Sequence, residues 1–380
     1  MKKKTKVIIS IFVVLFLIIG LVVGIIVYGL SSLSLTDDFL DGKICNNSDT
    51  CDTYTFIIEP GSTGKDTLNQ LYAEGIIKDS SIVYYYNRIF TGYSFVAGSF
   101  DIPRKMEDMY GNVHETTLDE LLDYLSKEEN ANLSTFTMKF DEGDFIKHFA
   151  RLIAQEIDVT EQEILDTWNS ESYVRSLMAD YDFLTEDVFN LNVKYYLEGY
   201  LFPDTYEFYR NASIDDITRK MLDRTQEIYE KYITEFDSSD LSIHEVFTLA
   251  SIVQWESGDE EDSKLVAGVF INRLNAPEVL ASTVTACYAS DLTKDECDEI
   301  GDTLDITQKY DPYNTYTVQG LPPGPVCCPN EVAIKAALNP DTEDGYFYFV
   351  ANMCDGGTVF AKTWEEHNRN IDRYYLACDD

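Results

Sequence analysis

The hydrophobic and polar positions divide the chain into an apolar start and a long patterned remainder. Residues 7–30 carry no charged side chain, and lysines stand at positions 2, 3, 4 and 6. A run of about 20 apolar residues can cross a bilayer, and basic residues favour the cytoplasmic side. We expect a cytoplasmic stub at 1–6, a transmembrane helix at 7–30, and everything from about residue 31 outside the cytoplasm. A cleaved signal peptide is the alternative, but its apolar region is usually shorter, about 7–15 residues.

Patterns of strand, turn and helix follow the apolar run. Residues 31–52 are polar and acidic and predict a linker. A β-prone stretch at 54–58 then precedes a turn and a run of leucines at helical spacing, and the same order recurs at 94–106 and 116–127. This pattern predicts a small α+β module over residues 53–135.

The rest of the chain, residues 136–380, predicts a larger α+β domain. A strand, a turn and a helix open it between 134 and 157. The stretch "LEGYLFPDTYEFY" at 197–209 is rich in glycine, proline and aromatic residues, which favours an ordered loop. A helix is expected at 263–274, and the proline-rich stretch 310–325 is too stiff for a helix or a central strand.

One helix in this domain ends on a carboxylate. Ser242 and Glu245 have the spacing of a capping box, so the helix is expected to begin there. Its apolar stripe includes Leu249, and Glu256 projects about 20° from that residue on a helical wheel. A carboxylate at an apolar edge loses solvation, which raises its pKa towards the range of a general acid. The alternative is a glutamate at the helix end that turns out to water.

Composition and charge narrow the possible partners. The chain has 380 residues, 45% hydrophobic and 25% charged, which is enough for two or three folded domains. It carries 67 acidic against 29 basic residues, a formal net charge of -38. Such a surface repels phosphates, so nucleic acid is not an expected partner.

Eight cysteines are present, an even number that suits an oxidising compartment. Disulfides are therefore expected, although the sequence does not determine their pairing. A zinc site is the alternative, but no CxxC pair occurs and the four histidines are not at ligand spacing. We expect no metal and no cofactor.

The remaining chemistry is acid–base work by carboxylates. The chain has no Gly-rich phosphate loop and no GxSxG motif, which argues against nucleophilic hydrolysis. Its 26 tyrosines could stack on sugar faces or simply pack loops. Ordinary glycosidases use two carboxylates, and the candidates beside Glu256 are Glu198, Asp204 and Asp259.

Five motifs in order then resemble one family. They are "LEGYLFPDTYEF", "LASIVQWES", "VAGVFINRL", "YNTYTVQGLPPGP" and "FVANMCDGGTVFAKTWEEHN". Behind one N-terminal anchor, they resemble the membrane-anchored endolytic murein transglycosylases of the YceG-like type. The resemblance implies a LysM-like module at 53–135 and a catalytic domain at 136–380 with a lysozyme-related helix. It also implies cleavage of the MurNAc–GlcNAc bond within nascent peptidoglycan strands, which leaves 1,6-anhydroMurNAc ends.

The resemblance also assigns roles to residues. The family's helix carries two acidic positions, of which this chain has Gln254 at the first and Glu256 at the second. Glu256 is therefore the expected catalytic acid and base, and a second catalytic carboxylate is not required. The residues expected to contact substrate or line its cleft are Glu198, Tyr200, Asp204, Ser257, Asn272, Tyr313, Asn314 and Tyr316.

Some positions depart from the family pattern. Ala281, Thr283 and Val284 stand where the family has Gln, Asp and Pro, and Thr358 stands where it has His. Cys328 stands where Asn is common. A catalytically impaired, membrane-anchored peptidoglycan-binding scaffold is therefore a second hypothesis. A muramidase that hydrolyses the bond and leaves reducing ends is a third.

The expected location is a bacterial cell membrane, with one membrane-spanning helix and the catalytic domain outside the cytoplasm. The expected partners are peptidoglycan glycan strands and, from the resemblance, wall synthases and other elongation or division proteins.

Overall fold

The computed structural model describes residues 29, 31–46, 51–132, 134–257, 259–292, 296–297, 310–354 and 356–376. These residues form two compact units. The small unit holds the described residues up to Phe136 together with Tyr209–Asp215, and the large unit holds Thr137–Phe208 and the described residues from Asp216 onward. The predicted transmembrane helix at 7–30 lies, apart from Gly29, outside the described residues. Among the described residues, no helix is both long and apolar enough to span a membrane.

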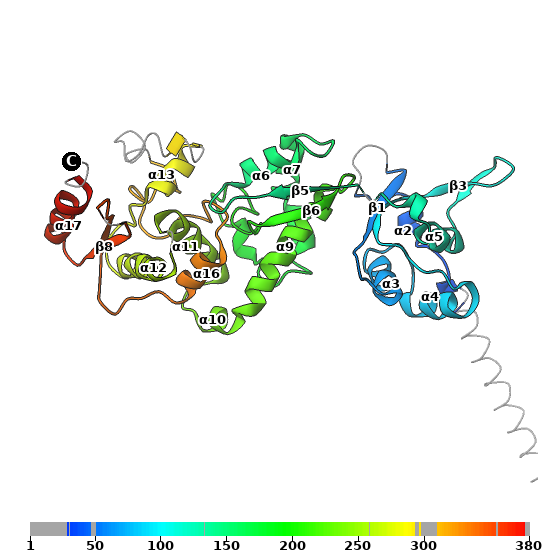
Figure 1. Cartoon of the computed structure of the whole chain (residues 1–380), viewed down its shortest axis with the longest axis horizontal. Coiled ribbons are helices and arrows are strands. Elements are labelled where there is room, and N and C mark those ends of the chain that lie inside the picture. The colour runs from blue at the N-terminus through cyan, green and yellow to red at the C-terminus, as the bar shows by residue number, and fades with distance from the viewer. Residues whose placement is uncertain are drawn as a thin grey trace, which may run out of the picture. The chain divides into compact units, whose positions relative to one another are not determined.

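The small unit combines short helices with two antiparallel strand pairs (Figure 1). Its elements in chain order are α2 (Asp37–Leu40), β1 (Thr53–Ile58), α3 (Gly64–Ala73), α4 (Ser80–Tyr86), the π-helical turn η1 (Asn87–Thr91), β2 (Gly98–Pro103), β3 (Lys105–Glu107), β4 (Val113–Glu115), α5 (Leu118–Leu125) and the 3-10 turn η2 (Glu128–Asn130).

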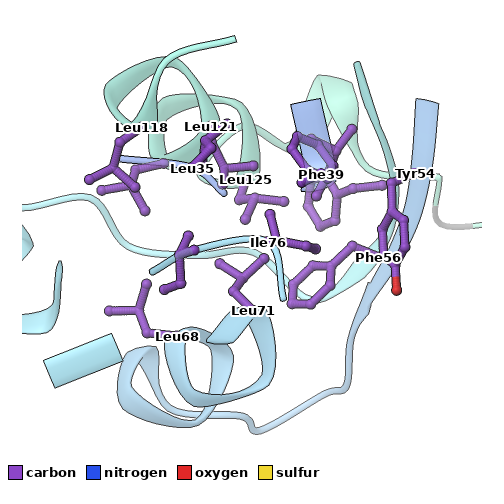
Figure 2. Packing of buried hydrophobic residues seen from close by; sticks show 14 of the residues in the cluster. Leu35, Phe39, Tyr54, Phe56, Leu68, Leu71, Ile76, Leu118, Leu121 and Leu125 are labelled. Carbon is purple, nitrogen blue, oxygen red and sulfur yellow. The ribbon is translucent and has the colours of Figure 1, made fainter. Parts of the chain in front are cut away.

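The strand β1 pairs antiparallel with β2, with Phe56 opposite Phe100, and both rings are buried. Helix α5 begins with a capping box in which Thr117 and Glu120 satisfy each other's backbone N–H groups. Its leucines at helical spacing lie in the same core as Phe56, together with residues of α3 (Figure 2). The α+β character expected for this part of the chain is confirmed.

Residues 31–46 belong to this core. Leu35 and Phe39 are buried within it, and Leu35 forms a β-bridge with Ile77. The linker prediction for 31–52 is therefore wrong for these residues, because the few apolar side chains of a polar stretch suffice to anchor it.

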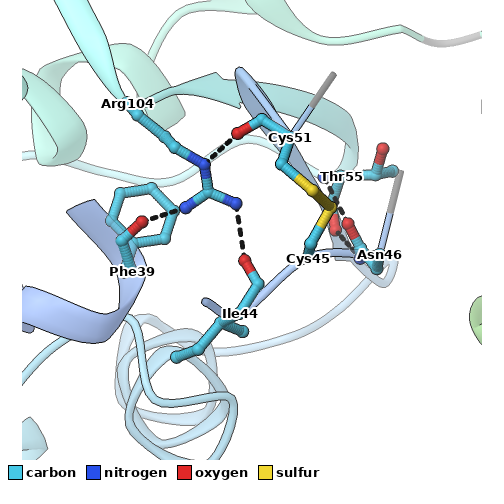
Figure 3. The surroundings of a disulfide bond; sticks show 7 residues. All are labelled: Phe39, Ile44, Cys45, Asn46, Cys51, Thr55 and Arg104. Atoms are coloured by element: carbon cyan, nitrogen blue, oxygen red, sulfur yellow. Dashed lines mark hydrogen bonds between the residues drawn. A yellow bond between two sulfur atoms is a disulfide. The ribbon is translucent and has the colours of Figure 1, made fainter. Parts of the chain in front are cut away.

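A buried arginine ties this entry segment to the sheet. The Arg104 guanidinium donates to the backbone oxygens of Phe39, Ile44 and Cys51 (Figure 3). It also lies 4.8 Å from the centre of the Phe39 ring. Cys51 is bonded to Cys45, so the arginine and the disulfide hold the same loop.

The large unit is mainly helical (Figure 1). Its elements are α6 (Ile146–Ile153), α7 (Glu161–Trp168), α8 (Glu171–Leu177), the 3-10 turn η3 (Glu186–Phe189), α9 (Ile214–Lys231), α10 (Ile233–Ser238), α11 (Ile243–Glu256), α12 (Glu260–Leu274), α13 (Thr283–Ala289), α16 (Glu331–Leu338), β7 (Tyr348–Ala351), β8 (Thr358–Ala361), α17 (Trp364–Asn370) and the π-helical turn η4 (Ile371–Leu376). The chain enters this unit within β5 (Thr135–Lys139) and leaves it within β6 (Thr205–Tyr209), and these two strands pair. The strand β6 thus occupies the end of a stretch expected to be a loop.

Helix α11 lies at the centre of the large unit, in contact with α12, α13 and α16. Ser242 and Glu245 form the expected capping box at its start. Nine of its 14 residues are buried, including Phe247 and Ile252 outside the predicted stripe. The buried surface of the helix is therefore wider than the predicted stripe, which is typical of a helix in the core of a unit.

We expect Arg104→Met to destabilise the small unit by about 3 kcal/mol, because three buried carbonyl oxygens lose their donor. Hydrogen exchange of the β1 and β2 amides in the oxidised protein measures this as a fall in protection of about 100-fold. Arg88→Met, at an exposed position, is the control and should change stability by less than about 0.5 kcal/mol. Equal protection in both variants would show that Arg104 does not hold the entry segment.

Candidate active site

Glu256 is the last residue of α11 and is half-buried. The Ser282 hydroxyl, directly before α13, donates to Glu256 Oε1 at 2.7 Å. Ser257 follows as the C-cap, and its backbone N–H donates to the Val253 carbonyl. The carboxyl group thus accepts from the Ser282 hydroxyl at the point where a buried helix reaches the surface of the unit.

Two electrostatic effects act on this carboxyl group in opposite senses. The C-terminus of a helix is the negative end of its dipole, which disfavours the ionised form of an acid there. Arg273 of α12 lies within electrostatic range of Glu256 and favours the ionised form. Arg273 itself is held in place by donating to the backbone oxygens of Phe347 and Leu280.

The Tyr316 side chain and a disulfide both lie beside α13. The hydroxyl groups of Thr283 and Tyr316 are 3.1 Å apart. Tyr316 and Trp255 both pack against the cluster that contains the Cys287–Cys297 disulfide. Among the tyrosines predicted to contact substrate, Tyr316 is therefore connected to the acid. It contacts Thr283, and the adjacent Ser282 bonds to Glu256.

A buried hydrogen-bonded chain lies at the other end of α11. His244 Nε2 lies 2.8 Å from the Pro323 carbonyl oxygen and can only donate to it, so Nδ1 accepts from the Tyr200 hydroxyl at 2.7 Å. Burial lowers the pKa of His244, which is consistent with this neutral form. Tyr200 is itself buried. It therefore connects segments and does not face a cleft.

Close backbone packing joins the same segments. Gly199 has a φ of +81°, and a Cβ there would lie 2.3 Å from the Pro325 Cβ. The Ser251 hydroxyl of α11 accepts from the Val326 N–H at 2.9 Å. Gln254, at the family's first acidic position, accepts from the Asn330 N–H at 2.8 Å. A glutamine side chain thus performs a structural task at this position.

Tyr313 and Asn314 are also buried. The Tyr313 hydroxyl accepts from the Lys194 N–H at 3.3 Å, and Asn314 Oδ1 accepts from the Tyr316 N–H at 3.1 Å. These two residues shape the segment that carries Tyr316.

Three further predicted residues have local partners. Asn272 donates to the Tyr346 carbonyl, and the Ser257 hydroxyl donates to the Asp259 carbonyl. Asp204 is exposed and forms an ion pair with Arg224.

Glu198 is buried away from Glu256, between two donors. Its oxygens accept from the Ile146 N–H at 3.1 Å and from the Tyr288 hydroxyl at 3.0 Å. Burial raises the pKa of Glu198 to about 8.

Sequence reasoning did not connect Ser282 with Glu256. Ser282 directly precedes Thr283, a position where the chain departs from the family pattern. This departure at Thr283 is the signal that could have pointed to the adjacent Ser282 hydroxyl.

The chain is similar to known proteins over most of its length. A sequence model of the YceG-like family matches residues 56–373, a range that includes parts of both units. The endolytic murein transglycosylase of Bacillus subtilis (strain 168) is 32% identical over 324 residues, which cover 85% of each chain. The endolytic murein transglycosylase of Streptococcus pneumoniae serotype 2 is 29% identical over 323 residues, which are 83% of this chain and 57% of that protein.

A solved structure agrees with these matches. The crystal structure of a yceG-like protein from Listeria monocytogenes superposes with a TM-score of 0.57 at 29% identity. The match covers 83% of this chain and 98% of the Listeria chain.

We expect Gly199→Ala to destabilise the large unit by about 3 kcal/mol or more, since the methyl group meets Pro325 and the backbone has a left-handed conformation. Gly320→Ala is the matched control, because its φ is +92° but nothing lies within 4 Å of the added Cβ. It should cost only about 1 kcal/mol. Chemical denaturation followed by the fluorescence of the large unit measures both, and equal losses would mean that the contact with Pro325 is not tight.

Proposed function

The chain belongs to the YceG-like family, and from this premise we propose that it is a lytic transglycosylase that cuts within peptidoglycan glycan strands. It breaks the bond between MurNAc and GlcNAc and leaves 1,6-anhydroMurNAc ends, which terminates or trims strands during wall assembly. The observation that carries the proposal is Glu256, a half-buried carboxyl group at the end of a core helix with a hydroxyl donor 2.7 Å away.

The reaction needs one carboxyl group that acts twice. Glu256 first gives its proton to the glycosidic oxygen while the bond from that oxygen to C1 of MurNAc breaks. The resulting carboxylate then takes the proton of the C6 hydroxyl while the C6 oxygen bonds to C1. No water is consumed, and the acid returns to its protonated form.

Ser282 and Arg273 support this cycle. The Ser282 hydroxyl fixes the orientation of Glu256 and stabilises its ionised form, which exists between the two proton transfers. Arg273, at longer range, favours the same form. The rise in the pKa of Glu256 expected from the sequence stays a prediction.

The cellular setting is part of the proposal. The apolar run at 7–30 serves as a single membrane-spanning helix with its lysines on the cytoplasmic side. Residues 53–135, which make up most of the small unit, act as the LysM-like module, and residues 136–380 form the catalytic domain that works outside the cytoplasm near wall synthases. The Cys45–Cys51 and Cys287–Cys297 disulfides support an oxidising location.

The scaffold hypothesis is not favoured. Thr283 and Thr358 replace the family's aspartate and histidine, but Thr283 bonds to Tyr316 and Thr358 pairs with Ala351 in the β7–β8 sheet. The chain retains the acid, and its named relatives are transglycosylases.

We expect Glu256→Gln to abolish cleavage and leave thermal unfolding unchanged, because the amide cannot transfer a proton. Mass spectrometry of uncrosslinked glycan strands is the measurement. The unaltered protein should release fragments one water lighter than those with reducing ends. Reducing ends would establish the muramidase instead, and full activity of the variant would remove Glu256 from the mechanism.

We expect Ser282→Ala to lower kcat about tenfold with little change in KM. Loss of the donated hydrogen bond disfavours the ionised carboxylate, so the limb on which activity falls with rising pH should move to higher pH. Ser238→Ala, on an exposed position of α10, is the control. An unchanged pH profile in Ser282→Ala would mean that Ser282 does not act on Glu256.

A further inference from the structure

A second feature of the large unit is a pocket of about 850 Å³. Its walls come from the end of β5, from α6, from the stretch 195–205 and from the end of α13. The volume is in the range of small-molecule and sugar sites. None of the catalytic roles assigned above uses this pocket.

The pocket lies along the same helix as the proposed acid. Ser282, bonded to Glu256, directly precedes α13, and Tyr288, bonded to Glu198, lies near its other end. A helix of seven residues is roughly 10 Å long. Trp255 stacks on Phe145 at 5.7 Å, and Phe145 meets Tyr288 edge-on at 5.6 Å. An aromatic wall therefore runs from beside the acid to the pocket, within reach of a strand of a few sugars.

Glu198 is the unusual member of the pocket wall. It is only 1% exposed, and its two oxygens accept from the Ile146 N–H and the Tyr288 hydroxyl. A neutral carboxylic acid carries one hydrogen of its own. With the Ile146 N–H and the Tyr288 hydroxyl both donating, as in this structure, that hydrogen can be donated to an acceptor on a bound molecule.

The charges facing Glu198 come from each element packed against it. Asp144, directly before α6, raises its pKa, whereas Lys147 on α6, the Ile146 N–H and the Tyr288 hydroxyl lower it. The buried groups Tyr313 and Cys328 also interact with it electrostatically. Burial outweighs the lowering effects, so the pKa is about 8 and the acid is mostly neutral at pH 7.

We infer that this pocket binds an N-acetylated sugar of the glycan strand, with Glu198 donating a hydrogen bond to the amide oxygen of the N-acetyl group. The inference rests on the proposed function and names a subsite beyond the cleavage point. The half-buried ring of Tyr195 offers an apolar face for the sugar or the acetyl methyl group, and the buried rings of Phe145 and Tyr288 also line the pocket. Exposed carboxylates such as Asp204 and Asp291 can accept from sugar hydroxyls.

The test uses the full-length protein in detergent with Glu256→Gln, so that no probe is cleaved. Calorimetry measures the affinity for chitotetraose and for cellotetraose, which has hydroxyls in place of the N-acetyl groups. We expect chitotetraose to bind at least tenfold more tightly at pH 7. Added Glu198→Leu should remove this preference, and added Glu198→Gln should restore most of it, since an amide N–H replaces the acid hydrogen. Glu227→Gln, at an exposed position, is the matched control.

The pH dependence separates a donor from a merely structural residue. The neutral acid binds, so affinity for chitotetraose should fall as pH rises through about 8 and should stay constant in Glu198→Gln. Tyr288→Phe removes a donor that favours the ionised form, so the fall should move to higher pH. This variant also tests the inference should Glu198→Leu not fold.

Equal affinity for the two probes, or the same loss at high pH in Glu198→Gln, would overturn the inference. Cleavage is measured separately with Glu256 intact. Absence of cleavage together with the expected binding pattern would reject the proposed reaction and retain the subsite.

Discussion

The large unit depends on the burial of helix α11 on nearly all of its sides. A helix so enclosed can carry polar groups only where each one finds a partner. His244 bonds to Tyr200 and Pro323, the Thr248 hydroxyl donates to the His244 carbonyl, and Ser251 bonds to Val326. Beyond the first turn, where Glu245 is exposed, the next partly exposed positions lie in the final turn. The acid therefore stands at the end of a helix whose rigidity comes from its own core.

This constraint gives the shared motifs two different physical roles. Gly199 and Pro325 approach so closely that no side chain fits between them. The adjacent Tyr200 bonds to His244 and so ties the same segment to α11. These residues hold three separate segments in register and are too buried to touch a glycan strand. Glu256 and Tyr316, in contrast, are partly exposed, so a bound strand can reach their side chains. A motif can thus be specific for a family because it builds the frame around the acid.

The sequence predicted those features that follow from local rules. The capping box of Ser242 and Glu245 marked the start of α11, and the helical spacing of leucines marked α5.

Long-range features were not predictable in the same way. The bond from Ser282 to Glu256 joins residues 26 positions apart, and nothing local distinguishes Ser282 from other serines. The predicted apolar stripe on α11 left out the buried residues Phe247 and Ile252. Hydrophobic patterning shows which residues can be buried, but it does not show how many neighbouring elements will cover a helix. Residues 31–46 were assigned to a linker because their polar composition hides the two buried apolar side chains, Leu35 and Phe39, that anchor them in the core.

The two carboxyl groups of the large unit show how environment divides chemical tasks. Glu256 is half-buried, accepts from the Ser282 hydroxyl and lies at a helix end, so it can exchange a proton with a bound strand. Glu198 is enclosed by donors and apolar rings, and its raised pKa keeps it neutral at pH 7. A buried acid in that state can hold a hydrogen bond but is poorly suited to cycle between charged and neutral forms. A transglycosylase needs only one acid that cycles, because the C6 hydroxyl of the substrate takes the place of water. The other carboxyl group is then free to serve recognition.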